Sequence, residues 1–146
     1  MSKNYVRAGM AGMAFAGLMS MALPAAAEKL SVTADLKAAN EVPSNKSKGT
    51  GAVAAAYDTA IKKLEWTVTY AGLSSAVTGA HFHGPADATK NAGVAIAISG
   101  DASPMAGSAT LTDAQAADLM AGKWYVNVHT AANKDGEIRG QVIKSK

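Results

Sequence analysis

The chain has 146 residues, with 14 basic and 11 acidic side chains and no cysteine. The length suits one domain with its own hydrophobic core rather than two. The absence of cysteine excludes a disulfide framework, thiolate metal ligands and thiol nucleophiles.

Residues 1–27 have the pattern of a secretory signal peptide. Lys3 and Arg7 precede an uncharged run of 16 residues, 8–23, and an Ala-x-Ala motif follows. The run could also be an uncleaved anchor, but it is shorter than the roughly 20 residues that span a bilayer comfortably. We therefore expect cleavage, a domain over 28–146, no membrane attachment after cleavage, and a periplasmic or secreted location.

Removal of this leader changes which partners the composition allows. Without Lys3 and Arg7 the chain keeps 12 basic and 11 acidic residues, a net charge near +1, which gives no electrostatic reason to expect nucleic-acid binding. Five of the seven methionines also leave, and only Met105 and Met120 remain. Two thioethers are too few for a methionine-rich Cu(I) carrier.

Alternation of apolar and polar residues predicts eight strands, separated by turn signals. They cover residues 30–37, 53–57, 64–70, 77–83, 93–99, 107–111, 124–129 and 137–143.

One segment differs from this pattern. Thr112 and Gln115 form a capping-box pattern, Leu119 and Met120 follow at helical spacing, and Gly122 suits the residue after a helix end. Many strands with one short helix predict a mainly β fold, an antiparallel Greek-key β-sandwich of seven or eight strands, with a closed barrel as the alternative.

The three histidines of the chain all fall in predicted strands. His81 and His83 lie two residues apart, so their side chains share one face, and His129 ends a later strand. Neutral imidazoles are the commonest metal ligands, and without competing thiolates they suit Zn²⁺ or Cu²⁺. We therefore predict one copper or zinc ion bound by His81, His83 and His129. The structural alternative is that these histidines only make hydrogen bonds.

Polar residues beside His129 form a possible second shell around this ion, namely Asn127, Glu137 and Arg139. Glu137 could orient an imidazole, act as a fourth ligand, or form a structural ion pair with Arg139 or a lysine, and we expect the ion pair. For Asn127 we expect side-chain to backbone hydrogen bonds that anchor the following hairpin loop, rather than a role at the metal.

Four motifs carry a resemblance to a known family: Asn40-Glu41-Val42-Pro43, Gly79-Ala80-His81-Phe82-His83-Gly84, Tyr125-Val126-Asn127-Val128-His129-Thr130, and Gly136-Glu137-Ile138-Arg139-Gly140-Gln141-Val142. In this order they resemble the CHRD domain, named after the animal extracellular protein chordin, from about Leu30 to Val142. The resemblance implies a secreted β-rich domain. In chordin such domains belong to an antagonist of bone morphogenetic proteins, whereas free-standing bacterial versions generally lack an assigned activity. A shared fold does not transfer that ligand to a single-domain protein.

These observations predict a secreted or periplasmic binding protein for copper or zinc buffering or delivery. The alternative is an extracellular module that binds another protein without a metal. A metal-dependent enzyme has less support, because no nucleophile and base are paired in the sequence, so we expect no catalytic residues and no enzymatic activity.

Overall fold

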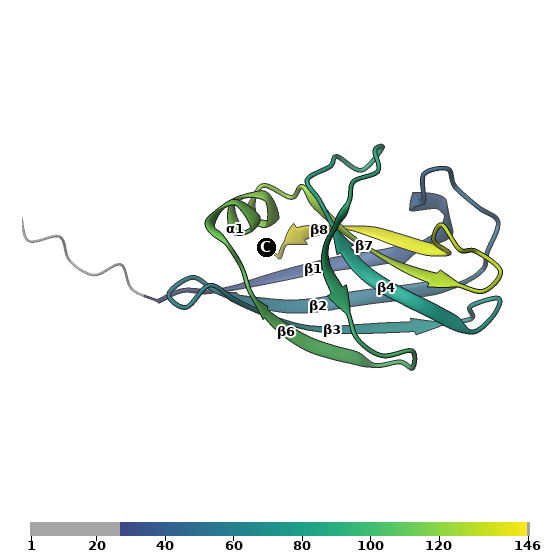
Figure 1. The fold of residues 1–146 in the computed structure, drawn as a ribbon, viewed down its shortest axis with the longest axis horizontal. Helices are drawn as coiled ribbons and strands as arrows, with labels where there is room; N and C mark the ends of the chain where they lie inside the picture. The colour runs from purple at the N-terminus through teal and green to yellow at the C-terminus, as the bar shows by residue number, and fades with distance from the viewer. Residues whose placement is uncertain (1–26, 146) are drawn as a thin grey trace, which may run out of the picture.

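The computed structural model describes residues 27–145 (Figure 1). The predicted signal peptide, apart from its last residue, lies outside the described residues. The elements are β1 (Lys29–Lys37), η1 (Ala38–Asn40), β2 (Thr50–Asp58), β3 (Lys63–Ala71), β4 (Val77–His83), β5 (Val94–Ile98), β6 (Met105–Thr110), α1 (Asp113–Met120), β7 (Trp124–Thr130) and β8 (Ile138–Lys144).

All eight strands belong to one antiparallel sheet in the order β5-β4-β7-β8-β1-β2-β3-β6. The sheet curls until it is nearly closed, with β5 and β6 as its two edges. The mainly antiparallel β fold with one helix is therefore confirmed. The two layers of the expected sandwich are parts of one continuous sheet.

The concave side of the sheet holds the hydrophobic core, to which every strand contributes at least one buried side chain. Its fully buried members include Val32, Leu36, Leu64, Val68, Phe82, Val126, Val128, Ile138 and Val142. The predicted capping box is present in α1, since the Thr112 side chain accepts from Gln115 N and the Gln115 side chain from Thr112 N. Figure 1 shows α1 at one end of the sheet, where Leu119 enters the core.

The polar side of β7 and β8 is also largely buried, and the sequence pattern did not predict that burial. Tyr125 and Arg139 are 3% and 1% exposed, respectively. Two loops cover them. Residues 84–93 provide Lys90 O and Asn91 Oδ1 as acceptors for Arg139, and residues 38–49 provide Asn40, which donates to Arg139 O. The side chains on this face therefore lie in a protected layer between sheet and loops.

In the part of the chain that the structure describes, no helix has both the length and the apolar character needed to cross a membrane.

Candidate metal centre

The pairing of β4 with β7 brings the three histidines to one face of the sheet. His81 pairs with Asn127, His83 with Tyr125, and His129 with Gly79. Directly paired residues of an antiparallel ladder point to the same side. Gly79 has no side chain, and the His81 ring lies over it, with Cε1 3.5 Å from the place that a Cβ would take.

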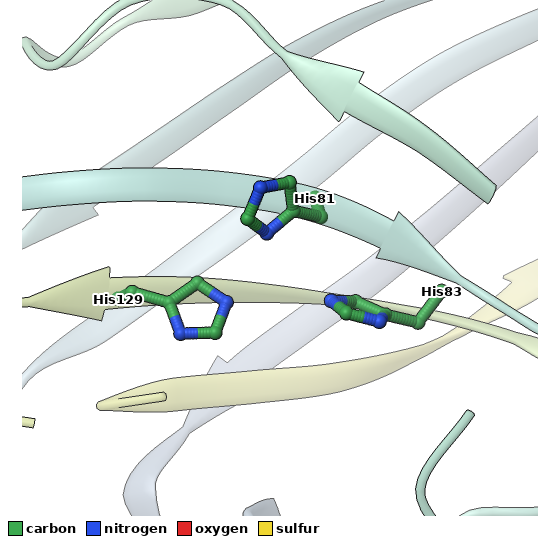
Figure 2. Close-up of side chains that lie close together, drawn as sticks. All are labelled: His81, His83 and His129. Carbon is green, nitrogen blue, oxygen red and sulfur yellow. The ribbon is translucent and has the colours of Figure 1, made fainter. Parts of the chain in front are cut away.

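The three rings converge on a small space above the two strands (Figure 2). Their centroids lie 5.0 Å apart for His81 and His129, 5.4 Å for His81 and His83, and 6.3 Å for His83 and His129. One nitrogen from each ring lies within 4.8 Å of the others. In a tetrahedral zinc site with Zn–N bonds of about 2.0–2.1 Å, the ligand nitrogens lie about 3.3 Å apart. The three histidines, whose nitrogens lie within 4.8 Å of one another, can thus hold one ion if these nitrogens move closer by up to about 1.5 Å.

Backbone carbonyls determine which nitrogen of two rings is free. Nδ1 of His83 lies 3.0 Å from Ala92 O, and Nδ1 of His129 lies 2.8 Å from Lys134 O. A carbonyl only accepts, so each Nδ1 carries the proton, and in the neutral ring Nε2 keeps a lone pair. This is the arrangement in which a metal-binding histidine is oriented by an outer hydrogen bond.

The inward nitrogens have no partner in the protein. Nε2 of His83, Nε2 of His129 and Nδ1 of His81 are all buried without a hydrogen bond. Buried polar atoms of native proteins are nearly always paired, with protein groups, water or ions. Three unpaired acceptors that face one another therefore need a cation or water between them.

The surroundings of His81 and His83 favour the neutral form of these two rings. Burial lowers the pKa of His81, and the nearby His129 and His83 lower it further. Burial also lowers the pKa of His83, against the opposing effects of the Ala92 carbonyl and the Asn127 amide. Neutral imidazoles are the form that binds metal.

His83 is also held by a stack of side chains from three adjacent strands. Its ring lies parallel to that of Tyr125, at 4.9 Å between centroids and 4° between planes. Arg139 Cζ lies 3.4 Å from the Tyr125 centroid. Because β7 lies between β4 and β8, Tyr125 separates the imidazole from the guanidinium. Arg139 thus supports His83 through Tyr125, and no contact with the free nitrogens is needed.

The ion pair expected for Glu137 is wrong. Its carboxylate accepts hydrogen bonds from Ser47 Oγ (2.5 Å), Ser74 N (2.7 Å), Ser74 Oγ (2.8 Å), Thr130 Oγ1 (2.6 Å) and Asn133 Nδ2 (3.2 Å). Within residues 27–145 no cation forms a salt bridge with it. Thr130 follows His129 and so points to the other side of β7. The hydrogen bonds of this carboxylate join three loops.

The expected anchoring role of Asn127 is also wrong. The amides that bond to the hairpin loop belong to Asn45, which donates to Gly136 O and Glu137 O, and to Asn133, which donates to the Glu137 carboxylate. Asn127 is 4% exposed and its Oδ1 is buried without a partner.

Glu41 is a residue of this layer that sequence patterns did not single out for chemistry. It is buried, its Oε1 has no partner, and burial raises its pKa from 4.5 to about 7 despite the attraction of Arg139. It lies in the polar loop after β1, where local patterns carry no information on burial. Its only signal was its place in the Asn40-Glu41-Val42-Pro43 motif.

Comparison with known proteins supplies the family. The model of the CHRD domain matches residues 32–142, which is most of the chain. The chain belongs to the CHRD domain family. The resemblance noted in the sequence is thereby confirmed, and all three histidines fall within the matched region. CHRD domains are extracellular-type binding modules, so the family supports a binding role in general terms.

Neither the curated proteins nor the solved structures contain a match to this CHRD domain.

Proposed function

We propose that this CHRD domain is a secreted or periplasmic metal-binding protein, which holds one copper or zinc ion through His81, His83 and His129 and serves in metal buffering or delivery. The observation that supports it most directly is the set of three buried, unpaired imidazole nitrogens within 4.8 Å of one another.

A bound ion offsets the free-energy cost of burying three acceptors without partners. A buried acceptor without a partner costs about 1–3 kcal/mol. A proton can satisfy one or two of the three nitrogens, but the lowered pKa of His81 and His83 opposes protonation at neutral pH. A divalent ion satisfies all three at once and leaves the rings neutral.

The ligands favour Zn²⁺ and Cu²⁺ over other common ions. Imidazole nitrogens suit both, whereas Mg²⁺ and Ca²⁺ prefer sets of oxygens. Binding has more support than catalysis, because Nδ1 of His83 and of His129 each hold a loop carbonyl and do not face a nucleophile.

Calorimetric titration of the metal-stripped mature protein with Zn²⁺ and Cu²⁺ at neutral pH tests the proposal. We expect one ion per chain, and loss of binding in His81→Ala/His83→Ala and in His129→Ala. Thr78→Ala is the matched control, an exposed residue of β4 outside the cluster, and it leaves binding unchanged. A folded wild type that binds neither ion contradicts the proposal.

A protein-interaction module without a metal is the second candidate, favoured by membership of the CHRD family. It predicts that a partner recovered by affinity capture binds equally well to the wild type and to His81→Ala/His83→Ala. A partner that requires the histidines and added metal would instead join the two functions.

A further inference from the structure

Asn127 lies at the centre of the proposed metal centre. On β7 it stands two residues from Tyr125 and two from His129, so all three side chains share one face. Across the ladder it pairs directly with His81. The Asn127 amide therefore lies among the three imidazoles, at a position that the register alone determines.

The oxygen of this amide, like the three ring nitrogens, is a buried acceptor without a hydrogen-bond donor. Asn127 Oδ1 is buried and has no hydrogen-bond partner. Because His83 Nδ1 already donates to Ala92 O, the free nitrogen of His83 is Nε2, which carries a lone pair and is also buried without a partner. A cation held between the imidazoles and the amide would satisfy both acceptors.

The other end of the amide lies against Gly136. A Cβ on Gly136 would lie 2.3 Å from Glu41 Oε1 and 2.8 Å from Asn127 Nδ2, so both atoms occupy the space left by the missing side chain. The NH₂ group therefore lies on the side of Gly136 and Glu41, without a hydrogen bond to Glu41 Oε1. With Nδ2 on that side, Oδ1 is left for the imidazoles.

We propose that Asn127 Oδ1 is the fourth ligand of the metal, completing a site of three nitrogens and one oxygen. This inference rests on the proposed function and makes it more specific. An amide oxygen is a hard ligand, which divalent ions accept and Cu(I) does not favour. The centre is accordingly selective for Zn²⁺, Co²⁺ or Cu²⁺ over Cu(I).

Three proteins test it: wild type, Asn127→Leu and Asn127→Asp. The first variant removes the oxygen at similar volume, and the second supplies a charged oxygen in the same place. The matched control is Gln141→Leu, which removes a half-buried amide from the same face, on β8, whose Oε1 is likewise buried without a partner. Each metal-stripped protein is titrated with Zn²⁺ and, under reducing conditions, with Cu(I), and its Co²⁺ complex is measured by visible absorption.

We expect Asn127→Leu to weaken Zn²⁺ binding by at least about tenfold, with little change in Cu(I) binding. Asn127→Asp retains or strengthens Zn²⁺ binding and shifts the Co²⁺ bands, because a carboxylate replaces the amide in the coordination sphere. Gln141→Leu keeps the affinity and spectrum of the wild type. If Asn127 were purely structural, Asn127→Leu would change the affinities for Zn²⁺ and Cu(I) by similar factors. Asn127→Asp would then leave the Co²⁺ spectrum unchanged.

The possible failures are distinct. If wild type and Asn127→Leu bind Zn²⁺ with affinities within about threefold, the fourth ligand is refuted while the three-histidine site stands. If Asn127→Leu does not fold, identical Co²⁺ spectra of wild type and Asn127→Asp refute it in the same way. If the wild type binds no metal, the proposed function fails, and this inference fails with it.

Discussion

Glu41 and Glu137 are both buried carboxyl groups, yet their surroundings affect them in opposite ways. Burial by itself raises the pKa of Glu137, but hydrogen bonds from Ser47, Thr130 and Ser74 outweigh it and lower that pKa to about 2. For Glu41, burial outweighs the attraction of Arg139 and a backbone hydrogen bond from Val42, and raises its pKa to about 7. Glu137 therefore contributes to stability as a carboxylate, whereas Glu41 opposes folding when it is ionised.

This contrast predicts how pH changes the effect of Glu41→Gln. The carboxyl group has a pKa near 4.5 in the unfolded chain and about 7 in the folded one, so the folded state binds the proton more tightly. Stability due to Glu41 is therefore full below pH 4.5 and declines as the pH rises to about 7. Relative to wild type, Glu41→Gln is expected to gain up to about 3 kcal/mol between pH 4 and pH 8, at about 1.4 kcal/mol per pKa unit.

Urea unfolding of wild type and variant at pH 4 and pH 8 measures this difference. Glu137→Gln is the control of opposite sign: it destabilises the protein fully at pH 8, and part of that effect is lost at pH 4, below the ordinary carboxyl pKa of 4.5. A Glu41→Gln effect that is independent of pH would contradict the environment described for Glu41.

At the scale of single residues, the sequence was informative about histidines and uninformative about buried acids. The spacing of His81 and His83 determines a shared face whatever the rest of the fold, and the strand containing His129 is clear from its pattern. The roles of Glu41, Asn127 and Glu137 depend on loops that come from distant parts of the chain. No local pattern encodes those contacts. The expectations for Glu137 and Asn127 therefore both required correction.

At the scale of elements, the pairing of β3 with β6 depends on a missing side chain. Trp66 pairs with Gly107, and a Cβ on Gly107 would lie 2.7 Å from Trp66 Cζ2. The indole, 6% exposed, thus packs on bare backbone and makes an edge contact with Phe82 at 5.2 Å. Close packing of β6 against the indole of β3 therefore depends on glycine at that position.

Gly107→Ala is therefore expected to destabilise the protein by about 1–3 kcal/mol, the usual cost of overpacking a core. The sign is informative, because alanine in place of glycine would otherwise strengthen a strand. Denaturant unfolding followed by tryptophan fluorescence measures the change. Ser108→Ala, at the exposed neighbouring position, is the control with an effect near zero. A stabilised Gly107→Ala protein would show that Trp66 does not occupy this place.

The elements themselves were largely predictable. All eight strands and the helix occur where the pattern placed them, and the largest boundary error is three residues, at the start of β2 (Thr50 rather than 53). Alternation is a local property, and one buried face is enough to produce it. Which strands become neighbours is a property of the whole chain, so the single nearly closed sheet was not separated in advance from two packed sheets.

At the scale of the whole molecule, the proposed metal centre would connect parts of the chain that the sheet leaves independent. β4 and β7 are already paired, so an ion bound between them adds little to the sheet. Through Nδ1, however, His83 holds Ala92 in the loop 84–93, and His129 holds Lys134 in the loop 131–137. An ion that fixes the rings therefore fixes both loops, of which 84–93 also covers Tyr125 and Arg139.

Hydrogen exchange tests this coupling. We expect Zn²⁺ to slow amide exchange in the loops 84–93 and 131–137, by up to about 100-fold at a free concentration 100 times the Kd. The turn 59–62 and the connection 99–104 are the internal controls, because neither is bonded to a histidine in the structure. All four segments are connecting loops that exchange through local opening, so a general stabilisation of the fold does not separate them. In His81→Ala/His83→Ala, Zn²⁺ should no longer slow exchange in the two histidine-linked loops. If Zn²⁺ slowed exchange equally in all four segments of the wild type, the ion would act on the whole fold and not through the rings.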